Sequence, residues 1–65
     1  MRIRVNGAWR ETSAVTLGSV LQELGYGEAV VATAVNGEFV PIGSRPSATL
    51  TEGDQLEVLA PMQGG

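Results

Sequence analysis

The dipeptide Asn-Gly occurs twice in this sequence, and each copy stands between two short runs with the composition of β-strands. Asn-Gly is the strongest short-range signal for a two-residue hairpin turn, because both residues of that turn need a positive φ angle. The first turn separates residues 2–6 from 8–12, and the second separates residues 30–35 from 38–41. The sequence therefore predicts two β-hairpins, so the fold must contain an antiparallel sheet.

Strand alternation divides the second hairpin into two faces. The cross-strand pairs that a two-residue turn sets are Val35 with Glu38, Ala34 with Phe39 and Thr33 with Val40. One face then carries Val31, Thr33, Val35 and Val40, and the other carries Ala32, Ala34 and Phe39. In the first hairpin Ile3 and Val5 share a face. Trp9 falls on the same face as Glu11, so we expect Trp9 to be only partly buried.

Residues 16–24 carry the pattern of an amphipathic helix. Apolar residues recur at spacings of three and four, which places them on one side of a helix: Leu17, Val20, Leu21 and Leu24. Thr16 is a natural N-cap, and Gly25 stands where a left-handed residue ends a helix. Gly18 weakens the first turn by about 1 kcal/mol relative to alanine.

The remaining residues predict one more strand after a loop. Residues 42–53 read as a loop region with Leu50 as its buried anchor, and residues 55–59 alternate, with Leu56 and Val58 inward and Glu57 and Leu59 outward. The helix must then cover one face of a mixed sheet in which the first hairpin and the last strand meet in the middle. This α+β layout, of about five strands on one helix, is that of a ubiquitin-like β-grasp domain over residues 1–60. Pro61 ends the last strand, so residues 61–65 are expected to form a flexible tail.

Composition excludes several classes of function. The 65 residues include no cysteine and no histidine, so thiolate catalysis and the usual metal ligands are absent, and we expect no metal site. A chain this short also has little room for a deep active-site cavity. Four arginines against seven acidic residues give a net charge of −3 without a basic cluster, which argues against nucleic acid. No apolar run reaches the length of a membrane span, and the lack of disulfides fits the reducing cytoplasm.

Two features indicate that the chain is bound by other proteins. The sequence ends in Gly64-Gly65, which alone is a weak signal. Phe39 and Leu59 both point away from the helix in the predicted pairing, with Ala32 and Ala34 between them, and exposed apolar patches of this kind mark interaction sites. The alternative is ordinary scattered exposure on a sheet face. Met62 either contacts a partner or is part of the tail without a contact of its own.

Several stretches resemble the ThiS family, the sulfur carrier proteins of thiamine biosynthesis. They are V-N-G at 5–7, T-L-x-x-V-L-x-x-L at 16–24, A-V-N-G-E-F-V-P at 34–41, E-G-D-x-L-E-V-L at 52–59 and P-M-Q-G-G at 61–65. The last stretch is the most specific, and together they cover nearly the whole chain. One departure is that the family often has a basic residue after V-P, followed by a tryptophan, whereas Pro41 is followed here by Ile42. Arg45 could substitute in space for that basic residue.

The resemblance implies a chemistry for the terminal carboxylate. An E1-like, ATP-dependent enzyme would adenylate Gly65, a persulfide on another protein would supply sulfur, and Gly65 would become a thiocarboxylate. Thiazole synthase would then take the sulfur into the thiazole ring of thiamine. ATP and Mg²⁺ would be bound by the adenylating partner and not by this chain, which would be a co-substrate and not an enzyme. Gly64 and Gly65 would be the reacting segment, and Phe39, Leu59, Met62 and Ala34 would contact the partners.

Two other readings stay open at this point. One keeps the mechanism and changes the sulfur acceptor, as in the small subunit of molybdopterin synthase or a carrier for another cofactor. The other is a ubiquitin-like modifier, which would form an amide through Gly65 with a target lysine, or a plain β-grasp binding module. An enzyme in its own right fits the composition least well.

Overall fold

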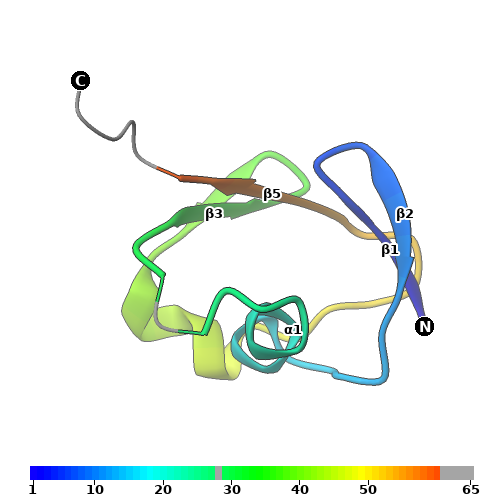
Figure 1. The fold of residues 1–65 in the computed structure, drawn as a ribbon, viewed down its shortest axis with the longest axis horizontal. Coiled ribbons are helices and arrows are strands. Elements are labelled where there is room, and N and C mark those ends of the chain that lie inside the picture. The colour runs from blue at the N-terminus through cyan, green and yellow to red at the C-terminus, as the bar shows by residue number, and fades with distance from the viewer. Residues whose placement is uncertain (28, 61–65) are drawn as a thin grey trace.

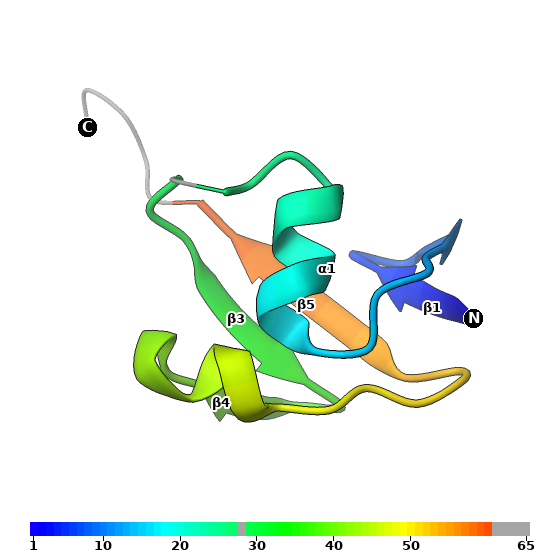
Figure 2. The same cartoon turned by 90° about the horizontal axis from the view of Figure 1, so that it is seen from below.

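The computed structural model describes residues 1–27 and 29–60, and its elements follow the predicted order. They are β1 (Arg2–Val5), β2 (Ala8–Glu11), α1 (Leu17–Glu23), β3 (Ala32–Val35), β4 (Glu38–Val40), a 3₁₀ helix η1 (Ile42–Ser47) and β5 (Gln55–Leu59). The strands form one sheet in the order β2-β1-β5-β3-β4. The sheet curls around one side of α1 (Figures 1 and 2).

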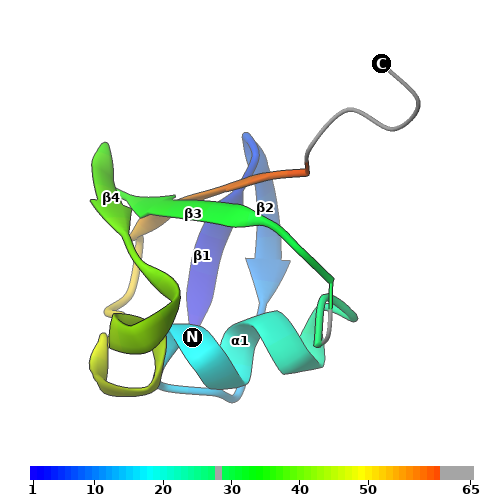
Figure 3. The ribbon, with the colours of Figure 1, turned by 90° about the vertical axis from the view of Figure 1, so that its left-hand side faces the viewer.

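The sheet is mixed because its central pair is parallel. β1 runs parallel to β5, and the pairs β1–β2, β3–β4 and β3–β5 are antiparallel. The first hairpin and the last strand therefore meet in the middle, as predicted. Figure 3 shows β3 across the top of the molecule and α1 along its base, with β1 running between them. No helix in residues 1–27 and 29–60 is both long and apolar enough to cross a membrane.

Both Asn-Gly dipeptides form the predicted turns. The φ angles are 51° at Asn6 and 87° at Gly7, and 51° at Asn36 and 85° at Gly37. Positive values at both central residues are the mark of a type I′ turn, whose twist matches that of the flanking strands. The register that this turn sets in the second hairpin, with Ala34 opposite Phe39, is the predicted one.

The core lies between α1 and the sheet and consists of residues that the alternation pointed inward. It is made of Ile3, Val5, Leu17, Val20, Leu21, Val31, Leu50, Leu56 and Val58. The helix ends are also as predicted: the hydroxyl of Thr16 accepts a hydrogen bond from Ser19 N at 3.2 Å, and Gly25 has a φ of 92°. Leu50 is the buried anchor of its segment, with 3% of its surface exposed.

The prediction of a loop over residues 42–53 was wrong for its first half, where η1 forms. A tertiary contact joins this segment to the sheet. The guanidinium of Arg45 donates from Nη2 to the carbonyl oxygen of Val31 at 2.6 Å and from Nε to the hydroxyl of Thr33 at 3.1 Å, which ties η1 to β3. Short 3₁₀ segments carry no long apolar periodicity. Arg45 is therefore turned inward by these bonds and is not a free cation at the surface.

Candidate functional site

The sheet face that α1 leaves uncovered carries the predicted apolar patch. Phe39 in β4 and Leu59 in β5 are each 68% exposed. Ala34 lies opposite Phe39, and Ala32 lies opposite Leu59, so β3 joins the two large side chains. We call Ala32, Ala34, Phe39 and Leu59 the apolar patch. Their positions are those that the sequence predicts, and their contact with a partner stays a prediction.

A shallow hollow adjoins this patch where β5 ends. It is lined by Val30, Val31, Ala32, Leu59 and Ala60. Val30 at its rim is 77% exposed, so this corner of the molecule presents aliphatic side chains to solvent. Ala60 is the last residue that the structure describes before the stretch 61–65. The hollow and the apolar patch therefore flank the point from which the chain continues toward Gly65 (Figure 1).

Three of the predicted site residues, Met62, Gly64 and Gly65, lie outside the described residues, as does the whole predicted tail of residues 61–65. The described part of the site is thus the platform next to the tail. The three predicted partner contacts on it, Ala34, Phe39 and Leu59, share one face, whereas Arg45 lies on η1 and is engaged with β3.

Two asparagines that the sequence assigned only to turns also hold β5 in place. The side chain of Asn6 donates to Val58 O at 3.1 Å and accepts from Val58 N at 2.8 Å. The side chain of Asn36 accepts from Gln55 N at 3.0 Å. Each hairpin therefore fastens the central strand through its own turn. The predicted position of the last strand beside both hairpins was the signal that could have revealed these bonds.

Hydrogen bonds also stabilise the ionised carboxylate of Asp54, which directly precedes β5. Asp54 accepts from Thr51 N at 2.8 Å and from the side chain of Asn36 at 3.0 Å. These bonds, chiefly the one from the Thr51 backbone, hold the pKa of the Asp54 carboxyl below its usual value. Asp54 is therefore part of the turn structure, whereas Glu57 is exposed beside Ala34, at the border of the apolar patch.

The described residues also bear on metal binding. In residues 1–27 and 29–60, no group of three or more acidic, histidine or cysteine side chains is placed to hold a metal ion. What this part of the chain presents is an exposed apolar patch, a hollow beside it, and the strand β5 that leads toward the terminal segment.

A mixed five-stranded sheet with a parallel central pair, curled around a single helix, defines the β-grasp class. Within that class, the profile of the ThiS family matches residues 3–65, so the chain belongs to the ThiS family. The resemblance drawn from the sequence motifs is thereby confirmed.

Two solved structures of thiamine biosynthesis proteins are similar to this chain. The crystal structure of thiamine biosynthesis protein ThiS from Geobacter metallireducens superposes with a TM-score of 0.84 and 28% identity, and the match covers all of both chains. The NMR solution structure of a thiamine biosynthesis protein from the same organism gives a TM-score of 0.80 and 26% identity, over all of this chain and 88% of the other. The predicted β-grasp fold is confirmed by these matches.

A curated relative matches over a much smaller share of its own length. This is a thiazole synthase of Paramagnetospirillum magneticum, 38% identical over an alignment of 66 positions that covers all of this chain and 20% of that protein. The chain therefore spans about a fifth of that relative. A ThiS-like segment thus occurs within a protein named for thiazole synthesis.

Proposed function

We propose that this chain is a sulfur carrier for thiamine biosynthesis and that the carboxylate of Gly65 carries the sulfur. The observation that carries the proposal is membership of the ThiS family over residues 3–65, a match that includes Gly64 and Gly65. The chain acts as a co-substrate that partner enzymes load and unload. Its lack of cysteine and histidine fits this role, because the carrier supplies an acyl group and not a catalytic base.

The proposed cycle first activates the carboxylate, which is a poor electrophile because its charge is delocalised. A carboxylate oxygen of Gly65 attacks the α-phosphorus of ATP in an E1-like enzyme, and pyrophosphate leaves to give an acyl-adenylate. The terminal sulfur of a protein persulfide then attacks the acyl carbon, and AMP leaves. Cleavage of the remaining sulfur–sulfur bond by a thiol gives the thiocarboxylate on Gly65. ATP and Mg²⁺ are bound by the adenylating enzyme.

The two terminal glycines suit this chemistry for a steric reason. Glycine has no Cβ, so its backbone can approach a phosphate or a substrate ring closely and can adopt conformations closed to other residues. Ordering a short chain segment in an active site carries an entropic cost. Contacts made by the folded domain must offset that cost.

The apolar patch supplies those contacts in this proposal. Leu59 directly precedes Ala60, and Phe39 exposes a large apolar surface on the same face of the sheet, so an enzyme that holds the terminal segment can cover the patch at the same time. Ala34 leaves room between the two larger side chains, and Met62 is proposed as a further apolar contact with the partner. Aromatic anchors at the centre of an interface contribute most of its binding energy, which makes Phe39 the leading candidate.

Thiazole synthase is the proposed acceptor of the sulfur. The matched segment within a thiazole synthase supports this choice, because that relative pairs a ThiS-like sequence with that activity in one protein. The persulfide donor is a third protein, and the absence of cysteine from the chain fits a reducing compartment such as the cytoplasm.

An intact mass measurement tests the proposal. The chain is incubated with an E1-like adenylating enzyme, ATP and a persulfide donor, and we expect replacement of one oxygen by sulfur at the C-terminus. A variant that lacks Gly65 is the matched control and should keep its mass and its fold. No gain of sulfur by the wild-type chain, with the enzymes active on another carrier, would favour a binding module.

Reconstitution then identifies the acceptor. The thiocarboxylate form is mixed with thiazole synthase or with the large subunit of molybdopterin synthase, and the loss of its sulfur is followed by mass. We expect sulfur to be lost to thiazole synthase alone. Transfer only to the molybdopterin enzyme would keep the carrier mechanism and reject thiamine as its pathway.

A further inference from the structure

The outward face of the first hairpin carries a second candidate surface, well away from the apolar patch. Trp9, the only tryptophan of the chain, is 51% exposed there. The guanidinium carbon of Arg2 lies 4.7 Å from the centroid of its ring, and that of Arg4 lies 5.5 Å away. Arg4 is directly opposite Trp9 in the β1–β2 ladder. We call Arg2, Arg4 and Trp9 the arginine–tryptophan surface.

Positive charge of this acidic chain gathers on the same hairpin. Three of the four arginines lie in β1 and β2, and the fourth, Arg45, is turned inward against β3. Within the described ranges 1–27 and 29–60, the one ion pair joins the N-terminal amine to Glu11 at 3.6 Å. Glu11 is opposite Arg2, and Glu52 accepts a hydrogen bond from the backbone of Arg2, so these carboxylates border the surface. Among the residues that the structure describes, the guanidiniums of Arg2 and Arg4 form no ion pair with a carboxylate.

Hydrogen bonding within the folded domain also leaves a donor of this surface unused. The Nη2 atom of Arg4 donates to Gly7 O at 3.3 Å, but its buried Nε atom has no acceptor among the described residues. The position of Arg4 against the Trp9 ring thus leaves part of its guanidinium without a hydrogen-bond acceptor among the described residues.

We infer that the arginine–tryptophan surface binds a carboxylate-rich segment of a partner protein. Guanidinium groups bind carboxylates through paired, charge-assisted hydrogen bonds, and the exposed half of the Trp9 ring offers apolar area beside them. Because the chain as a whole carries a charge of −3, an acidic partner is attracted to this hairpin and repelled from most of the remaining surface. The positive charge of Arg2 and Arg4 therefore favours an acidic partner and directs it to this hairpin.

The position of the surface leaves the apolar patch free. In Figure 1 the first hairpin lies at one end of the longest axis of the molecule, and the end of β5 lies at the other. A partner bound at the hairpin can thus hold the chain while another protein engages the terminal segment. The inference does not rest on the sulfur-carrier function, because the same surface would serve a modifier or a binding module.

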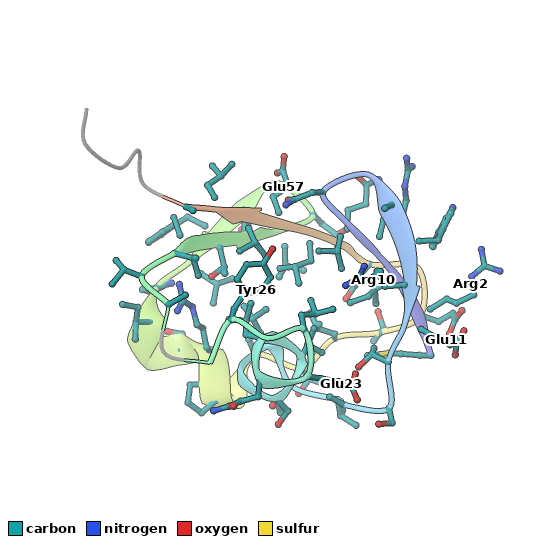
Figure 4. All side chains as sticks on the ribbon, in the orientation of Figure 1. Arg2, Arg10, Glu11, Glu23, Tyr26 and Glu57 are labelled. Atoms are coloured by element: carbon teal, nitrogen blue, oxygen red, sulfur yellow. The ribbon has the colours of Figure 1, made fainter. Side chains whose placement is uncertain are left out.

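The chain provides its own probe and its own control. Trp9 is the single tryptophan, so its fluorescence reports binding at this surface directly. Arg10 is in the same hairpin but is paired with Ile3, on the helix side of the sheet. Figure 4 shows Arg2 and Arg10 pointing to opposite sides of the hairpin. The substitution Arg10→Gln therefore removes the same charge as Arg4→Gln but leaves the surface intact.

The experiment titrates the protein with a ten-residue peptide of alternating glutamate and glycine at low and high salt. We expect a saturable change in Trp9 emission, weakened by salt, and an affinity about tenfold lower in Arg2→Gln and in Arg4→Gln, which corresponds to one lost charge-assisted pair. Arg10→Gln should bind within about twofold of the wild type, because that charge faces away. Thermal unfolding of each variant verifies that it folds.

Three outcomes would overturn the inference. The first is no saturable change in Trp9 emission at millimolar peptide, with no heat of binding by calorimetry. The second is an equal loss of affinity in Arg4→Gln and Arg10→Gln, which would show that the peptide responds to the net charge of the protein and not to this surface. The third is tighter binding of a ten-residue oligothymidylate with the same dependence on Arg2 and Arg4, which would assign the surface to nucleic acid.

Discussion

Asn6 and Val58 exchange two hydrogen bonds across the centre of the sheet, one through the side-chain amide and one through the side-chain carbonyl of the asparagine. The backbone N–H of Asn6 still donates to Leu56 O at 2.9 Å, but the chain then turns into the hairpin, so the Asn6 side chain supplies the next two bonds to β5. Without it, the N–H and C=O of Val58 would lack these partners shortly before the terminal segment. The same residue thus makes the hairpin turn and fixes the strand that leads to Gly65.

Replacing Asn6 by glycine should destabilise the domain by about 1–3 kcal/mol, since glycine keeps the positive φ angle but removes two hydrogen bonds to β5. Urea denaturation gives this value directly. Asn6→Asp keeps the acceptor for Val58 N but places a carboxylate oxygen against Val58 O, and the repulsion between these two acceptors should make its loss at least as large. Equal stability of Asn6→Gly and the wild type would mean that solvent replaces both bonds at no cost.

The fold was predictable because short-range signals agree with one another. The Asn-Gly turns set the register of Ala34 with Phe39, and the helix pattern ends at Gly25 where a left-handed residue is needed. The bonds that escaped prediction join residues far apart in the sequence: Asn6 and Val58 are 52 positions apart. They depend on where the whole sheet places each side chain, which no local pattern records. The bond from Arg45 to Val31, which joins η1 to the segment before β3, is of the same kind.

Stability should fall in acid, because Asp54 has a pKa below its ordinary value of 3.8 in the folded protein. A carboxyl with a lowered pKa stabilises the fold above its unfolded pKa, and this contribution is lost as the pH falls through the folded value. Glu23 should also contribute stability that is lost in acid, because the hydrogen bonds that it accepts from Thr12 and Ser13 lower its pKa from 4.5. Urea midpoints should therefore be flat near neutral pH and decline below about pH 4.

The variant Asp54→Asn separates this contribution from the general effect of acid. It should be less stable than the wild type near neutral pH, because an amide nitrogen cannot accept the bonds from Thr51 and Asn36. Its stability should also depend less on pH between pH 6 and pH 3. If the variant loses as much stability as the wild type between pH 6 and pH 3, Asp54 does not cause the loss of stability in acid.

Two glycines of the helix region should respond to alanine in opposite ways. A Cβ built at Gly18 would meet the carbonyl oxygen of Arg45 at 3.5 Å, which is an ordinary contact. Gly18→Ala should therefore stabilise the domain by up to about 1 kcal/mol through helix propensity. Gly25→Ala should destabilise it by about 1 kcal/mol, because φ is 92° at that position. A loss of stability in Gly18→Ala would show that η1 packs against α1 too closely for a methyl group.

The apolar patch makes its own prediction for binding. Phe39→Asp should weaken the complex with the adenylating enzyme by about tenfold or more, since it removes the largest exposed side chain of the patch and buries a charge in the interface. Phe39 is 68% exposed on an edge strand, so the free energy of unfolding should change by only about 1 kcal/mol or less. The measurement is the affinity for the enzyme, with stability from urea denaturation beside it.

Val15→Asp is the matched control, because Val15 is also an exposed aliphatic residue, at 58%, but lies in the connection before α1 and outside the patch. Its charge change equals that of Phe39→Asp, so any general repulsion between the acidic carrier and the enzyme appears in both variants. The difference between the two affinities is then the local contribution of the patch. If both variants bind equally well, the enzyme does not cover this face of the sheet, and the terminal segment must supply the affinity by itself.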